Sequence, residues 1–108
     1  MDTSEPSGVD LVTSFLKGQN LEQIGRVDEA VRLYEGAVAA RFDSPGPYDR
    51  LIHIYSDRAE HGEVVRVSTA ALENVRTHQA KLEWYEQMRQ AAKRAASDVP
   101  PAAPKRNT

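Results

Sequence analysis

The sequence contains no cysteine and only one tryptophan, and none of its apolar runs is long. The lack of cysteine excludes disulfides, thiolate zinc sites, iron–sulfur clusters and a cysteine nucleophile. A membrane-spanning helix needs about 20 consecutive apolar residues, so none is expected. The N-terminus, Met1 to Pro6, is acidic and polar, unlike the basic start of a signal peptide. We therefore expect a cytoplasmic protein.

Neither sign of charge is in large excess. The 108 residues include 16 acidic and 14 basic side chains, which argues against a general nucleic-acid binder. The charges are unevenly placed, because residues 1–60 hold 11 acidic and 6 basic side chains (−5), and residues 61–108 hold 5 and 8 (+3). Ends of opposite sign favour head-to-tail or antiparallel self-pairing, or a partner that contacts one end only.

Motifs for catalysis and phosphate binding are also missing. The chain has no G-x-S-x-G, no glycine-rich phosphate loop and no H-E-x-x-H. His53 and Asp57 are four residues apart, but a metal site usually needs a third and a fourth ligand. We expect no enzyme activity, no cofactor and no metal, and assign no catalytic, cofactor-binding or metal-ligating residue.

What the sequence does contain is helical periodicity, without sustained strand-like alternation. The first helix is expected to start near Ser7, capped by Ser7 with Asp10, and to end at Gly25. Four more are expected over 27–41, 47–60, 63–76 and 78–97, with the Pro45 and Pro47 segment ending the second. Short loops indicate antiparallel neighbours. Residues 1–7 are interpreted as a flexible arm, 8–97 as the all-α domain and 98–108 as a disordered Pro/Ala/basic tail.

Each expected helix has one apolar or small-residue face. These faces are Leu11, Phe15, Gly18 and Leu21; Ala30, Leu33, Tyr34, Ala37 and Val38; Tyr48, Leu51, Ile52 and Tyr55; Val64, Val67, Ala71, Leu72 and Val75; and Leu82, Tyr85, Met88 or Arg89, and Ala92.

The chain also repeats itself at a shift of 34 residues. The shift pairs Leu21 with Tyr55, and the turn at Gly25 with the turn at Ala59. Thirty-four is the period of the tetratricopeptide repeat, a helix–turn–helix unit. In residues 18–37 and again in 48–71, the order of small and large side chains resembles the pattern of one repeat of that family. The matching residues are Gly18, Leu21, Gly25, Ala30, Tyr34 and Ala37 in the first repeat, and Tyr48, Leu51, Tyr55, Val64 and Ala71 in the second.

The resemblance covers roughly residues 10–77, and it has departures. Ser14 and Lys17 stand where the family prefers a large aromatic residue and a leucine, and Ser68 replaces the aromatic residue that matches Tyr34. The repeat-ending proline is not in place. The alternative is a generic bundle of four or five helices.

The resemblance implies an α-solenoid of two antiparallel helix–turn–helix repeats with a capping helix. It also implies a groove, lined by the first helix of each pair, that holds a peptide or a helix. The groove residues would be Val12, Phe15, Gln19, Glu22, Asp49, His53, Ser56, Asp57, Glu83, Trp84 and Gln87. An apolar spot (Val12, Phe15) beside acidic residues favours a partner with an apolar anchor and basic flanks. Alternatively, Val12 and Phe15 complete the core of an end repeat.

The last expected helix has a second apolar stripe, formed by Trp84, Met88, Ala91 and Ala95. Two repeats are fewer than solenoids usually need, so this stripe is a candidate surface for a homodimer. The alternative is a solvent-facing capping helix.

These features favour a non-catalytic adaptor that binds another protein or itself. Ten arginines against four lysines, with fourteen alanines, indicate a GC-rich, bacterial-like genome. The alternative is a small regulatory or DNA-associated protein that acts through basic C-terminal residues, Arg89, Lys93, Arg94, Lys105 and Arg106. Those residues have no interleaved aromatics, and Asp43, Asp49 and Asp57 near the Pro45 turn would repel phosphates, so nucleic acid is the less favoured partner.

Overall fold

The computed structural model describes residues 8–98, which form five α-helices and no strand. They are α1 (Gly8–Gln23), α2 (Val27–Ala39), α3 (Pro45–Asp57), α4 (His61–Asn74) and α5 (Gln79–Asp98). The prediction of an all-α fold with five helices is confirmed. The expected arm with its Ser7 cap, and residues 99–108 of the expected tail, lie outside the described residues. Asp98, which was assigned to that tail, ends α5 instead.

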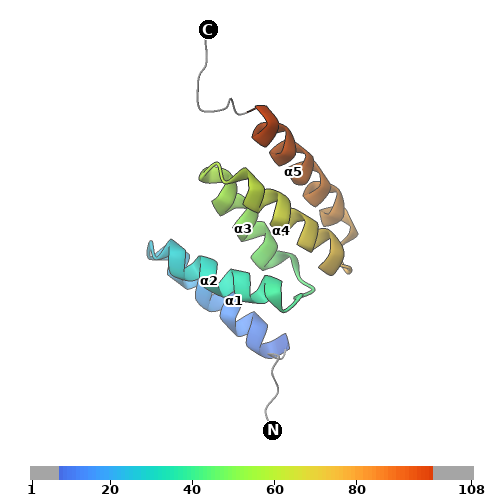
Figure 1. The fold of residues 1–108 in the computed structure, drawn as a ribbon. Helices are drawn as coiled ribbons and strands as arrows, with labels where there is room; N and C mark the ends of the chain where they lie inside the picture. Colours follow the sequence, from blue (N-terminus) through green and yellow to red (C-terminus); the bar gives the residue numbers. More distant parts are fainter. Residues whose placement is uncertain (1–7, 99–108) are drawn as a thin grey trace.

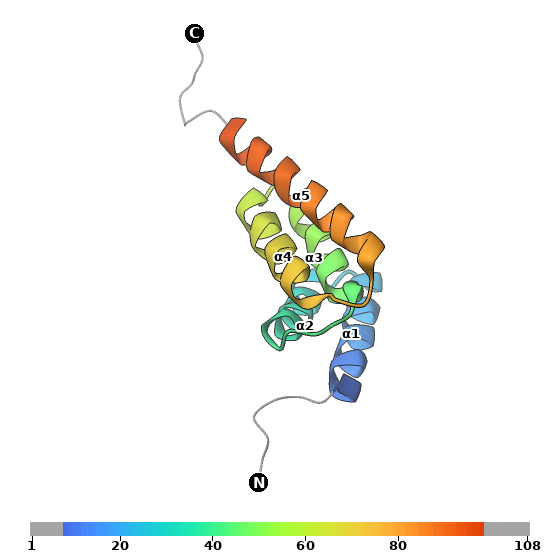
Figure 2. The ribbon, with the colours of Figure 1, turned by 90° about the vertical axis from the view of Figure 1, so that its right-hand side faces the viewer.

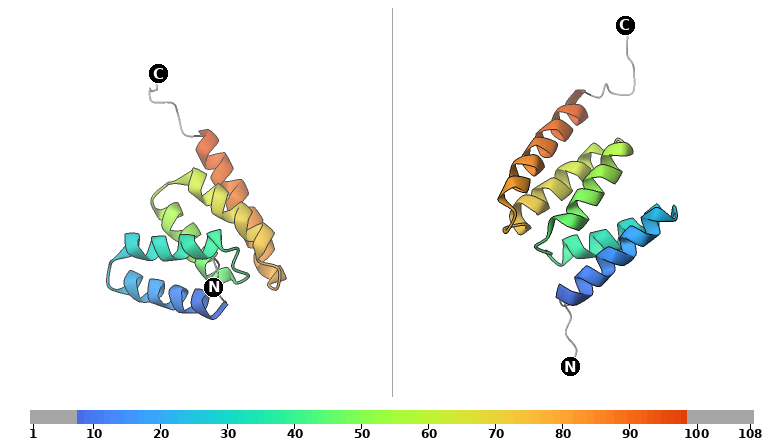
Figure 3. Two further views of the ribbon diagram at one scale, coloured as in Figure 1. Left: turned by 60° about the horizontal axis from the view of Figure 1, so that its bottom comes forward. Right: turned by 180° about the vertical axis from the view of Figure 1, so that it is seen from behind.

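The helices form an open stack of two layers. Helices α1 and α2 form one antiparallel hairpin, α3 and α4 form a second, and α5 runs antiparallel along α4 (Figure 1). Figure 2 shows the first hairpin and α5 at opposite ends of the stack. In the right-hand view of Figure 3, α1 and α3 lie in front of α2 and α4. None of the helices within residues 8–98 has the length and apolarity needed to span a membrane.

The turns after α1 and α3 have the same backbone geometry. The N–H of Gly25 donates to the carbonyl of Glu22, and that of Arg26 to the carbonyl of Leu21. The same two bonds recur 34 residues later, from Ala59 and Glu60. This is the Schellman turn, which needs a positive φ at the residue after the C-cap. The φ angle is 85° at Gly25 and 57° at Ala59, so the 34-residue repeat extends to the backbone of the turns.

All helix boundaries except the start at Val27 differ from the expected ones by one to three residues, and two of these differences have a local reason. Helix α3 starts at Pro45, not at residue 47, because proline fits the first helical position, where its missing N–H is not needed. The segment around Pro45 therefore begins a helix as well as separating two. Helix α2 ends at Ala39, before the expected residue 41, in another Schellman turn with a positive φ (58°) at Arg41. A non-glycine residue there leaves no signal in the sequence.

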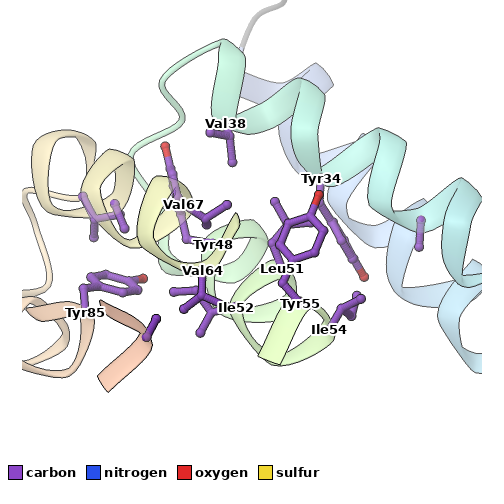
Figure 4. Packing of buried hydrophobic residues seen from close by; sticks show 14 residues of the cluster. Tyr34, Val38, Tyr48, Leu51, Ile52, Ile54, Tyr55, Val64, Val67 and Tyr85 are labelled. Carbon is purple, nitrogen blue, oxygen red and sulfur yellow. The ribbon is translucent and has the colours of Figure 1, made fainter. Parts of the chain in front are cut away.

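The core is centred on α3 and extends into the neighbouring helices. Figure 4 shows Leu51, Ile52 and Tyr55 of α3 between Tyr34 of α2 on one side and Tyr85 of α5 on the other. The expected inner faces of α2 to α5 are buried, except that Leu33, Leu72, Leu82, Met88 and Arg89 are only partly covered. Periodicity therefore located most of the core.

Gly18 lets α1 and α2 approach closely. A Cβ atom at Gly18 would lie 2.6 Å from Cε1 of the fully buried Tyr34 ring. No side chain other than hydrogen fits at this position without displacing that ring.

Candidate functional site

Helices α1, α3 and α5 are joined side by side through charged and aromatic side chains. At the first junction, the hydroxyl of Tyr34 donates to Oε1 of Glu22 at 2.7 Å. Arg50 donates to both oxygens of the same carboxylate, at 2.8 and 2.6 Å. The hydrogen bond from Arg50 lowers the pKa of Glu22 against the opposing effect of burial, and Tyr34 lowers it further. One carboxylate thus ties together α1, α2 and α3.

The second junction repeats this device between α3 and α5. The hydroxyl of Tyr85 donates to Oδ1 of Asp49 at 2.8 Å, and Lys81 Nζ lies 3.0 Å from Oδ2. Burial, and then the hydrogen bond to Asp49, raises the pKa of Tyr85. A third cluster of the same kind lies in the other layer, where Glu35 of α2 accepts from Tyr55 and from Arg66. Each cluster joins a tyrosine and a cation to one carboxylate.

These pairs change the charge pattern expected from the sequence. Of the four acidic residues predicted along the groove, Glu22 and Asp49 are neutralised internally. Asp57 and Glu83 are exposed and pair with no cation in the described part of the chain. The acidic first hairpin is likewise balanced from within, because arginines of α3 and α4 pair with its carboxylates: Arg50 with Glu22, Arg58 with Asp28, and Arg66 with Glu35. Two ion pairs, Arg66 with Glu35 and Lys81 with Asp49, join the acidic residues 1–60 to the basic residues 61–108, so part of the charge asymmetry is neutralised within the molecule.

A shallow polar pocket of about 340 Å³ lies where α1 meets α3. Its lining is Gln19, Glu22, Gln23 and Arg50. The two glutamines are one helical turn apart, and neither makes a hydrogen bond with the described residues. Each amide carries both donors and an acceptor, so the pair matches the alternating N–H and C=O groups of a peptide backbone.

An aromatic platform continues this surface from α3 to α5. His53 follows Arg50 by three residues on α3, so the two side chains share one face of that helix. The exposed ring of His53 lies 5.6 Å from that of Trp84, measured between centroids. Lys81 Nζ lies 4.2 Å from the centroid of the Trp84 ring. We call the polar pocket and this platform together the groove surface: Gln19, Glu22, Gln23, Arg50, His53, Lys81 and Trp84.

Several predicted groove residues are not part of the groove surface. The ring of Phe15 packs 5.8 Å from that of Tyr34, and a Cβ atom on Gly46 of α3 would lie 2.6 Å from it. Phe15 therefore fills the junction of α1, α2 and α3, which is the core interpretation. Val12, Asp57, Glu83 and Gln87 are exposed and do not line the pocket, and Ser56 is partly buried.

The apolar stripe of α5 is split between two surroundings. Trp84 belongs to the platform beside His53, whereas Met88, Ala91 and Ala95 line a shallow cavity of about 180 Å³. Its other walls are Ser56, His61, Val64 and Ala92. Most of the stripe therefore faces the α3–α4 turn of the same chain.

Four residues that were not singled out in the sequence have a notable position in the structure. Gln23, Arg50 and Lys81 complete the groove surface. Each lies within four residues of a predicted groove position on the same helix, and this spacing was the available signal. Leu16 is 52% exposed on α1, and it was overlooked because it fits no position of the repeat pattern.

Within residues 8–98 no three His, Asp or Glu side chains converge so that they could hold a metal ion. Comparisons of the chain with protein-family models, with curated proteins and with solved structures give no match.

Proposed function

We propose that this protein is a non-catalytic interaction module of tetratricopeptide type that binds a peptide or a partner helix on the groove surface. The observation that carries the proposal is the alignment of α1, α3 and α5, which places two uncommitted glutamine amides and an aromatic platform on one surface. The 34-residue recurrence of the Schellman turns supports the repeat type.

The side chains on this surface define the partner's chemistry. Gln19 and Gln23 can satisfy both the N–H and the C=O groups of a bound backbone. The His53 and Trp84 rings, tilted by 38° to each other, offer an aromatic contact, and aromatic residues supply much of the affinity at such interfaces. Asp57 lies outside the groove surface, one helical turn beyond His53 on α3, so its exposed carboxylate favours a basic residue at the partner's flank. The partner is therefore a segment with one apolar anchor and neighbouring lysine or arginine.

Trp84 provides a direct readout, because it is the only tryptophan of the chain. The probe is a set of linear peptides selected from a random display library against the wild-type protein. Each peptide is then titrated while Trp84 fluorescence is followed. We expect selected peptides to share an apolar residue flanked by basic ones, and to bind saturably.

Variants on the groove surface test whether binding occurs there. Gln23 and His53 are exposed and make no hydrogen bond within residues 8–98, so Gln23→Ala and His53→Ala should leave the fold intact. Together they should weaken binding about tenfold, as expected for contact residues. Gln79→Ala, at an exposed glutamine that begins α5, is the matched control and should bind as wild type does. Equal affinity in all variants would refute this site.

The DNA-associated alternative has less support. Among the basic residues of α5, Lys81 pairs with Asp49 and Arg89 pairs with Glu86. Lys93 and Arg94 remain as exposed cations on that helix, and Lys105 and Arg106 lie outside the described residues. Two exposed cations on α5 are fewer than the basic patch that nucleic-acid binding needs.

A further inference from the structure

The ammonium group of Lys81 occupies a small site that suits a cation. Its Nζ atom lies 4.2 Å from the centroid of the Trp84 ring, 5.8 Å from that of the Tyr85 ring, and 3.0 Å from Oδ2 of Asp49. The negative face of an aromatic ring attracts a cation, and a carboxylate adds a full opposite charge. We call Asp49, Trp84 and Tyr85 the cation site.

Contacts other than those with Lys81 hold the cation site in place. The hydroxyl of Tyr85 donates to Oδ1 of Asp49 at 2.8 Å, which leaves Oδ2 for the cation. Tyr85 is fully buried, and the Trp84 ring packs against the rings of Tyr85 and His53, with centroid distances of 5.5 and 5.6 Å. The site is therefore preorganised, and a cation from another chain would meet the same carboxylate and the same rings.

Lys81 is an occupant that a better cation can replace. Its side chain is 34% exposed, so the ammonium group can return to water, where it is strongly hydrated. An arginine guanidinium is planar and more weakly hydrated, and it stacks on aromatic rings. A partner bound on the groove surface also brings its side chains close, which offsets the advantage that Lys81 has as part of the same chain. An arginine therefore gains from the exchange, whereas a second lysine does not.

We propose that the cation site receives an arginine side chain of the bound partner, and that Lys81 competes with this arginine. The inference rests on the proposed function, because Lys81 and Trp84 are part of the groove surface. It assigns a place to one basic residue of the partner. As the built-in competitor, Lys81 weakens the binding of all such partners and selects arginine over lysine.

The first test needs no partner peptide. The probe is N-acetyl-arginine amide, titrated while the fluorescence of Trp84, the only tryptophan of the chain, is followed. Lys81→Met removes the competing charge and should bind the probe about tenfold more tightly than the wild type does, a ratio that corresponds to one cation–π contact. Lys93→Met, at an exposed lysine of the same helix, is the matched control and should bind as the wild type does.

Two further variants separate competition from a purely structural role of Lys81. Lys81→Arg gives the site a stronger internal occupant, so it should bind the probe more weakly than the wild type does. Asp49→Asn, combined with Lys81→Met, keeps an acceptor for the Tyr85 hydroxyl but removes the charge, and should abolish the gain. If Lys81 only stabilised the fold, Lys81→Met would not bind the probe more tightly. That result would overturn the proposal, as would tighter binding by Lys81→Arg.

Peptides selected on the groove surface provide a comparison that does not depend on the folding of any variant. Replacing the arginine of a selected peptide by lysine should weaken its binding to the wild type about tenfold, and equal affinities would overturn the proposal. The two proposals can also fail separately. Probe binding by Lys81→Met without any selected peptide would refute the groove function alone. Selected peptides that bind Lys81→Met and the wild type equally would refute the cation site alone.

Discussion

Replacing Gly18 by alanine should destabilise the protein, although the same change in most helices is stabilising. Gly18 lies inside α1, where alanine is favoured over glycine by about 1 kcal/mol. The new Cβ would lie 2.6 Å from Cε1 and 3.1 Å from Cζ of Tyr34. Carbon atoms normally approach to only about 3.5–4.0 Å. The two effects therefore oppose each other, and their sizes decide the sign.

The Tyr34 ring has little freedom to move away. It is fully buried, and its hydroxyl is held by Glu22 at 2.7 Å. Forcing an extra carbon into a packed core costs about 1–3 kcal/mol. Moving the ring also weakens a hydrogen bond to a charged group, which contributes about 1.5–3 kcal/mol. After the gain in helix propensity is subtracted, we expect a net loss of about 1–3 kcal/mol in the free energy of unfolding.

Gly36→Ala is the matched control in α2. Gly36 is also inside a helix, but a Cβ there would meet no atom within 4 Å. This variant should therefore gain about 0.5–1 kcal/mol. Urea unfolding of both variants, followed by circular dichroism, measures the two changes. If Gly18→Ala were stabilised as much as Gly36→Ala, the close packing of α1 on Tyr34 would be refuted.

Three other changes test separate features of the fold. Ala59→Gly should raise the free energy of unfolding by about 1 kcal/mol in thermal melts, because Ala59 has a φ of 57°, which strains alanine but not glycine. An unchanged free energy of unfolding would refute the strain at this turn. Ser68→Ala should raise the free energy of unfolding, measured in urea, by about 1 kcal/mol, because the buried Ser68 hydroxyl has no hydrogen-bond partner among the described residues. A decrease in the free energy of unfolding would show that the hydroxyl has such a partner. Burial, and then hydrogen bonds to carboxylates, raises the pKa of Tyr34, Tyr55 and Tyr85 in the folded protein. The neutral tyrosines therefore contribute their full stability to the fold below about pH 10, the pKa of an unfolded tyrosine, and this contribution is lost as the pH rises above it. Tyrosinate absorbance should therefore appear together with unfolding in an alkaline titration, and ionisation of these tyrosines in the folded protein would contradict their burial.

The sequence predicted the features that depend on neighbouring residues. Helical periodicity located the five helices and put Tyr34, Tyr48, Tyr55 and Tyr85 in the core, where all four are buried. The repeat shift of 34 residues paired the turn at Gly25 with the turn at Ala59, and the two turns make the same pair of backbone hydrogen bonds. Both kinds of signal arise within a few turns of the chain, so the local residues suffice to produce them.

The groove surface shows where this reasoning stops. Glu22 looked like an exposed acid available to a partner, yet it is occupied by Arg50, which is 28 residues away in the sequence. Phe15 had two open interpretations, and the contact of its ring with Tyr34 and Gly46 decided for the core. Spacing along one helix cannot distinguish these cases, because the partner belongs to another helix.

The absences in the sequence and its periodicity thus determined three features of the protein: helices without strands in residues 8–98, no thiol chemistry and a tyrosine-rich core. The packing of the helices decided which charges remain available and which apolar residues stay exposed. Arg50 and Lys81 neutralise carboxylates whose partners the sequence did not identify, and Leu16 is 52% exposed because no other helix of residues 8–98 covers it. The physical reason is range: helix formation depends on residues three and four apart, whereas charge pairing and exposure depend on which helix faces meet.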